Sequence, residues 1–258
     1  MVKEIKVIDV TQDNIYESPC CGIKNIEHEG HKRKTNWLKT YFKKGLKAKV
    51  LWTEDNRQFG YIEYLPGKYA WRGVEADGYM FIHCIWTFFK KYKKKGYGKF
   101  LIQAALDDAK KAKMKGVAVV ARKSPWLASS DLFLKNGFEI MDTAPPDYEL
   151  LVKKLSTSAS NPKFKNSWDK KLKKYAKGLT IIRSDQCPHV AKFADDIAEI
   201  TEKTYKLKPR IVELKTHQDA QNAPTPYTVF AVIYNGQFLA DRQISKSRFR
   251  NIMNRILQ

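Results

Sequence analysis

The hydrophobic pattern of the first half of the chain predicts strands that alternate with helices. Apolar and polar residues alternate over residues 2–10, 47–52 and 59–64, as in strands with one buried face. The second and third of these form a predicted hairpin, because acidic and amide residues separate them. Two almost wholly apolar segments, 79–89 and 117–121, are typical of strands buried on both faces.

Helical periodicity lies between these strands. Residues 26–41 read as one helix. Leu101, Ala105 and Ala109 follow one another at steps of four, which predicts an amphipathic helix that opens at a glycine turn and stops at Gly116. A short capped helix is expected from residue 129, ending at a glycine.

The second half repeats this alternation with fewer elements. The pattern predicts strands at 179–182, 210–214, 228–234 and 237–240, a helix after Val190, and a last helix capped by Ser245. The Asn235-Gly236 pair is typical of a tight hairpin turn. Small polar residues follow Lys154, so we expect a domain at 1–155, a linker at 156–176 and a domain at 177–258, each folding alone.

The turn before the central helix is suited to an anion. It contains Gly96 and Gly98 and follows a run of lysines. Glycines allow a close backbone approach, and the unpaired N–H groups of a helix's first turn point at one spot. The helix dipole and the lysines add positive potential there. The sequence therefore predicts a polyphosphate site.

Two motifs in this order resemble the GNAT superfamily of acyl-CoA N-acyltransferases. The segment Lys93 to Gly98 matches its pyrophosphate loop, with lysine in the first place, and Phe133 to Phe138 matches its later Tyr-x-x-x-Gly-Phe motif, with phenylalanine replacing tyrosine. The resemblance implies a mixed α/β (α+β) fold whose mostly antiparallel sheet carries helices on both faces, with acetyl-CoA (coenzyme A) as cofactor. The implied cofactor-binding residues are Trp86, Phe88, Lys93, Lys94, Lys95, Gly96, Tyr97, Gly98, Lys99 and Phe133.

The same resemblance implies a direct attack of an acceptor amine on the thioester. Glu63 on the hairpin is the first candidate for general base, and His83 is the second. A solvent-facing glutamate is the alternative for Glu63. Members commonly use a tyrosine to protonate the departing thiolate, and Phe133 cannot, so this step is expected to be slower or to use another group.

The second half resembles thioredoxin-like proteins, and glutaredoxins most closely. Cys187 matches the nucleophilic cysteine, Val190 replaces the second cysteine, and Pro226 matches the cis-proline. A helix N-terminus favours a thiolate, so we expect the pKa of Cys187 below its ordinary value. A degenerate scaffold that only positions a substrate is an equal alternative. The two halves together resemble the YoaP family.

Three further cysteines lie in the first half, at Cys20, Cys21 and Cys84, and are candidates for contact with the substrate. They leave a second function open: a thiol-based binding or redox-sensing protein, in which these residues and Cys187 hold a metal, a metalloid or a small thiol. Packing of one buried thiol is the plainer alternative. No metal site is predicted.

Composition changes this picture little. The net charge of +21 is compatible with nucleic-acid binding, but the lysines are scattered over both halves, so we favour a lysine-rich surface. No stretch reaches the ~20 apolar residues that span a bilayer. We expect a cytoplasmic protein with reduced cysteines, acting on a small-molecule or peptide amine. The oligomeric state stays open.

Overall fold

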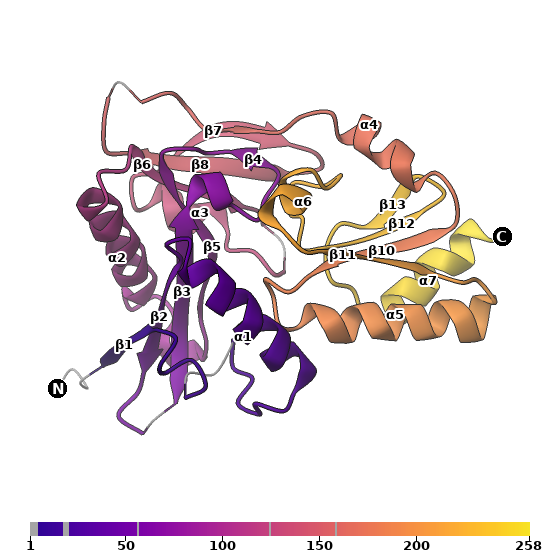
Figure 1. Cartoon of the computed structure of the whole chain (residues 1–258), viewed down its shortest axis with the longest axis horizontal. Helices are drawn as coiled ribbons and strands as arrows, with labels where there is room; N and C mark the ends of the chain where they lie inside the picture. The colour runs from indigo at the N-terminus through magenta and orange to yellow at the C-terminus, as the bar shows by residue number, and fades with distance from the viewer. Residues whose placement is uncertain (1–4, 18–20, 56, 124, 158) are drawn as a thin grey trace.

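A computed structural model describes residues 5–17, 21–55, 57–123, 125–157 and 159–258. Two lobes lie side by side along the longest axis, with residues 6–10 toward one end and residues 246–256 toward the other (Figure 1). We call residues 5–155 the N-terminal lobe and residues 177–258 the C-terminal lobe. Among the described residues, no helix has the length and apolar character needed to cross a membrane.

The N-terminal lobe is built on a seven-stranded sheet in the order β1-β2-β3-β5-β6-β8-β7. Its strands are β1 Lys6–Val10, β2 Lys47–Trp52, β3 Gln58–Pro66, β5 Tyr79–Thr87, β6 Gly116–Ala121, β7 Glu139–Ala144 and β8 Tyr148–Lys154. Only the β5–β6 pair is parallel. The predicted hairpin and both buried strands are confirmed.

Helices cover both faces of this sheet, as predicted. One face packs against α1 (Glu29–Phe42), which contributes Trp37, Leu38 and Tyr41 to a buried cluster. The other face packs against α2 (Tyr97–Lys111) and contacts α3 (Ser130–Leu134) through Phe133. Successive side chains of β3 point to opposite faces of the sheet. Tyr61 therefore belongs to the buried cluster on the α1 side, and Ile62 belongs to the cluster on the α2 side.

The two parallel strands separate halfway along β5. Their register ends at the pair Ile82 and Val119, while β5 continues to Thr87. The register of β5 with β3 shifts next to Glu63, which places a bulge at His83. The last five residues of β5 therefore leave one edge of main-chain groups without a neighbouring β6 residue. This edge is where the site described below begins.

The C-terminal lobe has a four-stranded sheet in the order β11-β10-β12-β13. Its elements are β10 Leu179–Ser184, α5 Val190–Tyr205, β11 Arg210–Leu214, α6 His217–Gln221, β12 Phe230–Tyr234, β13 Gln237–Ala240 and α7 Lys246–Ile256. The β10–β11 pair is parallel and the other pairs are antiparallel. In the part of the chain that the structure describes, the one cis peptide bond joins Pro145 to Pro146, so the prediction for Pro226 was wrong.

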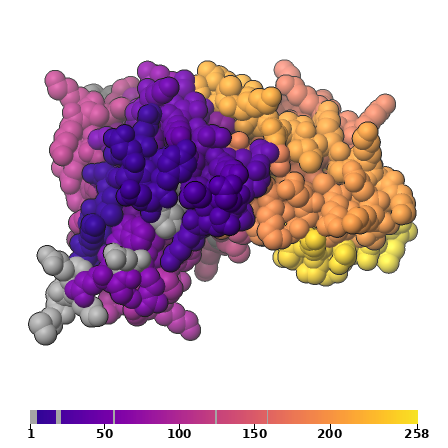
Figure 2. All heavy atoms as spheres, turned by 60° about the horizontal axis from the view of Figure 1, so that its bottom comes forward, coloured from indigo at the N-terminus to yellow at the C-terminus, as the bar shows by residue number. Residues whose placement is uncertain are grey.

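Residues 156–176 carry structure of their own. Strand β9 (Lys163–Phe164) pairs with β4 (Val74–Glu75), and α4 (Trp168–Leu172) follows it. Each of two buried clusters includes residues of both lobes, such as Phe81 with Ile181 and Tyr41 with Ile233. The two lobes meet along a continuous surface (Figure 2). Separate folding of the two halves is not tested by this structure. The clusters that both lobes share argue against it.

Candidate active site

The N-terminus of α2 forms one wall of a pocket that we call the glycine-turn pocket. Gly96 is the N-cap residue, with a φ of 84°, and a Cβ built on it would meet no atom within 4 Å. The pocket encloses about 260 Å³. It is lined by Ile85, Trp86, Thr87, Tyr92, Lys93, Lys94, Gly96, Tyr97, Gly98, Lys99, Leu132, Lys135 and Asn136.

Most of the predicted cofactor-binding residues meet here. Lys95 and Phe133 are not among the lining residues, and Phe88 lies in the neighbouring cavity. The helix start and its lysines give this pocket a positive potential and free N–H groups, the features that bind phosphate. The residues present therefore fit the pyrophosphate of a coenzyme A.

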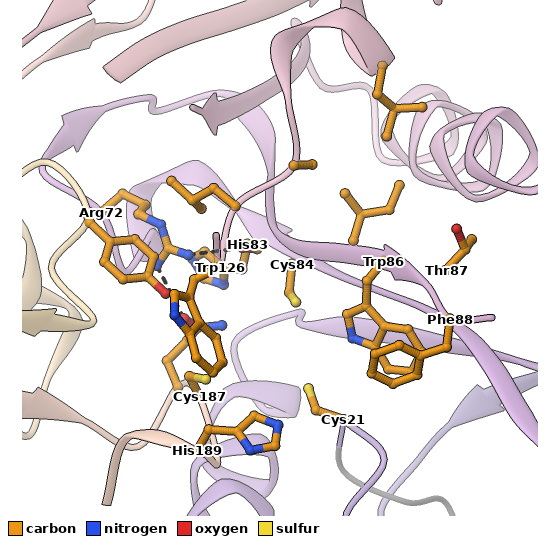
Figure 3. Close-up of a pocket in the computed structure, with 16 residues that line it drawn as sticks. Cys21, Arg72, His83, Cys84, Trp86, Thr87, Phe88, Trp126, Cys187 and His189 are labelled. Atoms are coloured by element: carbon orange, nitrogen blue, oxygen red, sulfur yellow. Dashed lines mark hydrogen bonds between the residues drawn. The ribbon is translucent and has the colours of Figure 1, made fainter. Parts of the chain in front are cut away.

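A second, deeper cavity adjoins this pocket, and the two share Ile85, Trp86, Thr87 and Leu132. It encloses about 420 Å³, and we call it the thiol cavity (Figure 3). Its lining is Cys21, Arg72, His83, Cys84, Ile85, Trp86, Thr87, Phe88, Trp126, Leu127, Ala128, Leu132, Gln186, Cys187, His189 and Tyr227. Both lobes build it, and the free edge of β5 leads from one pocket into the other.

Three of the predicted cysteines face this cavity, and Cys20 lies outside the described residues. The thiols of Cys21 and Cys84 point toward one another in Figure 3. The Cys84 thiol, through a hydrogen bond, and the Lys34 ammonium lower the pKa of Cys21, although burial acts against them. The same hydrogen bond and burial raise the pKa of Cys84 well above its ordinary value.

Cys187 lies just before α5, as predicted, but its titration differs from the prediction. Burial raises its pKa to about 12, and a hydrogen bond from the His189 backbone only partly offsets this effect. The side-chain amide of Gln243 lies 3.7 Å from its sulfur. The expectation of a lowered Cys187 pKa was therefore wrong, because desolvation by burial outweighs the helix dipole.

Glu63 lies behind the wall of the thiol cavity and is fully buried. One carboxylate oxygen accepts hydrogen bonds from the Lys34 ammonium at 2.5 Å and the Tyr61 hydroxyl at 2.6 Å. The other accepts from the Gln186 amide at 2.6 Å. Burial and the carboxylate raise the pKa of Tyr61 well above its ordinary value. Glu63 is thus the centre of a buried network and not a solvent-facing residue.

Lys34 carries the positive charge of this network. Its ammonium also donates to the Gln186 carbonyl at 2.6 Å and lies 4.1 Å from the centre of the Trp37 ring. Burial opposes its charged form, but Glu63 and Cys21 outweigh burial and raise the pKa of Lys34. The ammonium is therefore charged at neutral pH, beside the thiol cavity.

His83, the second candidate base, is held by the backbone. Its Nε2 accepts a hydrogen bond from the Trp71 N–H at 2.8 Å, so we assign the ring proton to Nδ1, which lies 3.9 Å from Glu63. Burial, with the charges of Arg72 and Lys34, lowers the pKa of His83 well below its ordinary value. The ring is neutral, and its accepting nitrogen is already occupied.

Arg72 also lines the thiol cavity. Its guanidinium is buried and donates to three acceptors, which are the carbonyls of Trp71 and His83 and the side chain of Gln186. Burial lowers its pKa. The sequence pattern did not single out Arg72, Lys34 or Gln186, because each becomes buried only through long-range packing.

Phe133 is fully buried and packs against Phe138, with ring centres 5.5 Å apart. It lies below the same part of β5, close to His83 and Cys84. Among the described residues that line the small cavity beside Phe133, none carries a hydroxyl. Among the described residues, no group of three or more His, Cys, Asp or Glu side chains is arranged to hold a metal ion.

Comparison with known proteins agrees with this geometry. Residues 14–138 match the family model "Acetyltransferase (GNAT) family", and residues 210–251 match the model "YoaP-like". A protein of Bacillus subtilis (strain 168), the uncharacterized N-acetyltransferase YoaP, is 32% identical over 252 residues, which cover 96% of this chain and 98% of the relative.

Solved structures match part of the chain, at lower identity. The PaiA N-acetyltransferase of Thermoplasma acidophilum, solved with coenzyme A, is 15% identical, covers 58% of this chain and 99% of its own, and gives a TM-score of 0.42. The yncA protein of Salmonella typhimurium, solved with acetyl-CoA, is 12% identical, with coverage of 60% and 96% and a TM-score of 0.45.

Proposed function

Because the chain belongs to the acetyltransferase (GNAT) family and is related to YoaP along nearly its whole length, we propose that it transfers an acetyl group from acetyl-CoA to an amine held in the thiol cavity. Membership makes the chain an acyltransferase. The observation that carries the proposal is the continuity of the glycine-turn pocket with the thiol cavity along the free edge of β5.

The residues around this edge suit a coenzyme with a diphosphate at one end and a thioester at the other. The first turn of α2 would hold the diphosphate, with Lys93 and Lys94 adding charge. The main chain of β5 beyond Ile82 would hold the connecting arm, since its edge is free there. The bound coenzyme supplies an acetyl group activated as a thioester.

The acceptor is proposed to be a small amine with an apolar part. Trp86, Phe88 and Trp126 line the cavity, and the rings of the first two lie 4.1 Å apart. The cavity volume of about 420 Å³ suits a small ligand rather than a folded partner. Arg72 and Tyr227, at the other end, offer polar atoms that could orient it.

Glu63 stays our proposed general base for direct attack, with one structural condition. Both of its oxygens are engaged, and the residue does not line the cavity. Direct proton abstraction by Glu63 therefore requires a rearrangement that frees one oxygen. If Glu63 is the base, Glu63→Gln should lower kcat strongly with little change in the affinity for acetyl-CoA; an unchanged kcat would assign Glu63 to holding Lys34.

The C-terminal lobe is proposed to be a thioredoxin-like domain that completes the cavity. Its strand order, with β10 between parallel β11 and antiparallel β12, supports this view. The turn before α5 contributes Gln186, Cys187 and His189 to the cavity wall. We therefore favour the positioning role over redox catalysis.

The proposal is tested by coenzyme binding and coenzyme release. Gly98→Glu would place a carboxylate in the diphosphate pocket, where its Cβ starts 3.0 Å from the movable end of Leu132. Like charges at ~4 Å cost about 1–4 kcal/mol, so affinity for acetyl-CoA should fall at least ~5-fold. Gln103→Glu, on the exposed face of the same helix, adds equal charge outside the pocket and is the control.

Titration calorimetry gives the affinity, and a thiol reagent gives the free coenzyme A released with a panel of amines. Equal affinity of the Gly98→Glu and Gln103→Glu variants would contradict the assignment of the pocket. Absence of coenzyme release with every amine would contradict the proposed transfer.

A further inference from the structure

We propose that the acetyl group is carried on the sulfur of Cys21 before it reaches the amine. The inference rests on the proposed acetyl transfer and assigns Cys21 as a catalytic nucleophile, in place of a direct attack by the amine. Four features of the thiol cavity support it.

The first feature is position. Cys84 lies on β5 two residues beyond Ile82, the last residue paired with β6, and its thiol points toward that of Cys21 (Figure 3). Both thiols line the cavity at its junction with the glycine-turn pocket, beside Trp86. A thioester that runs along the free edge of β5 would end among these sulfurs.

The second feature is charge. The Cys84 thiol donates to Cys21, the Lys34 ammonium stabilises negative charge nearby, and the Trp86 indole donates a further hydrogen bond; together they lower the pKa of Cys21. The pKa values of Cys84 and Cys187 are raised by contrast. Of the three thiols that line the cavity, Cys21 is the one whose pKa is lowered, and its sulfur faces that of Cys84, so we assign it as the nucleophile.

The third feature is that the other candidate bases are engaged. Glu63 lies behind the wall with both oxygens hydrogen-bonded, and the Nε2 of His83 accepts from the backbone of Trp71. The side chains of both residues are buried. A thiol loses its proton more readily than an amine that is charged at neutral pH, so a cysteine pathway depends less on these two side chains.

The fourth feature is the way Cys21 is held. The N–H of Gly22 donates to the Gln58 side chain at 3.2 Å, and a Cβ at Gly22 would touch Phe88 at 3.4 Å. On the other side, the His189 ring donates to the backbone carbonyl of Cys21. Cys21 is thus fixed from both lobes, as a nucleophile must be if the reacting atoms are to stay aligned.

The chemistry balances in two steps. In the first, a bond forms between the Cys21 sulfur and the acetyl carbon while the carbon–sulfur bond of the donor breaks. The electron pair leaves on the donor sulfur, which takes up a proton from water. In the second, the amine nitrogen attacks the acetyl carbon, the bond to Cys21 breaks, and Cys21 returns as thiolate while the nitrogen loses its extra proton to water.

The test is mass spectrometry of the full-length chain mixed with acetyl-CoA in a phosphine reductant and without an amine. We expect one acetyl group per chain, removed by neutral hydroxylamine as a thioester is. Fragment ions that separate Cys20 from Cys21 should place it on Cys21. It should form within one turnover time and disappear when an accepted amine is added.

Cys21→Ser should bind acetyl-CoA with unchanged affinity, measured by calorimetry, but accumulate no hydroxylamine-labile acetyl group. Labelling of Cys20, Cys84 or Cys187 instead of Cys21 would overturn the inference. Release of coenzyme A with an amine, without any acetyl-Cys21 on the turnover timescale, would overturn it and leave the proposed transfer by direct attack intact. No coenzyme release under any condition would instead contradict the proposed function itself.

Discussion

The buried pair of Lys34 and Glu63 allows a quantitative test of the network beneath the thiol cavity. Replacement of Lys34 by methionine keeps most of the side-chain volume and removes the charge. Glu63 would then remain as a buried carboxylate with two neutral donors, Tyr61 and Gln186. We expect Lys34→Met to destabilise the protein strongly, because Glu63 is inaccessible to solvent and loses its counter-ion.

The magnitude follows from this burial. Removing one partner of a buried ion pair typically costs ~3–5 kcal/mol. For a chain of this size each kcal/mol corresponds to ~2–4 °C of melting temperature, so we expect a fall of roughly 6–20 °C. The pKa of Lys34 is raised, so its contribution is fully present below the unfolded-state value of ~10.4 and is lost only as the pH rises through the folded-state value. Measurements at pH 7 therefore report the whole effect.

The assay is urea unfolding, with thermal melting beside it, on a double-mutant cycle of Lys34→Met and Glu63→Gln. The double variant should lose less than the sum of the two single variants, because no unpaired charge remains. Lys32→Met is the matched control: Lys32 pairs with Glu27 at 2.6 Å, close to the 2.5 Å of the buried pair, but on the surface. We expect no measurable change in the free energy of unfolding for Lys32→Met.

A Lys34→Met variant that melts within ~2 °C of the wild type would refute this reasoning, as would strictly additive effects in the cycle. The first result would mean that water or a rearrangement solvates Glu63. The second would mean that the two side chains do not depend on one another.

Three further predictions concern the thiols and the contact between the lobes. Cys21 should react with iodoacetamide faster than Cys187 at pH 7, because the pKa of Cys21 is lowered and that of Cys187 is raised to about 12. Mass spectrometry measures both labelling rates, and equal rates would contradict this order. A Gly→Ala change ordinarily stabilises a helix by ~1 kcal/mol. Gly30→Ala should instead destabilise the protein by about 1–3 kcal/mol, because the new Cβ would lie 1.9 Å from the Pro188 carbonyl oxygen. A raised melting temperature would exclude this contact. A fragment of residues 1–155 should bind a hydrophobic dye and aggregate, because Trp37 and Tyr41 lose their cover from the C-terminal lobe; a monomeric, cooperatively folding fragment would show that the lobes fold separately.

The sequence predicted those features that depend on local pattern. The hairpin follows from apolar residues at every second position, and α2 with its glycine turn follows from apolar residues at about every fourth position. Both appear where expected. Lys34 lies at helical spacing from Trp37 and Leu38 on the buried face of α1, but a lysine does not by itself indicate burial, and its partners come from residues 63 and 186. The pKa of Cys187 was mispredicted for a related reason: the helix start is local, but the burial arises from a cluster of residues that lie far apart in the sequence.

The thiol cavity draws its walls from Cys21 to Tyr227, nearly the whole length of the chain. During synthesis, the lysine and glutamate beneath the cavity leave the ribosome long before Gln186, the residue that joins them. A nascent or prematurely terminated chain therefore lacks the wall that Gln186, Cys187 and His189 form, and its Lys34 and Glu63 lack the Gln186 groups that bond to both of them.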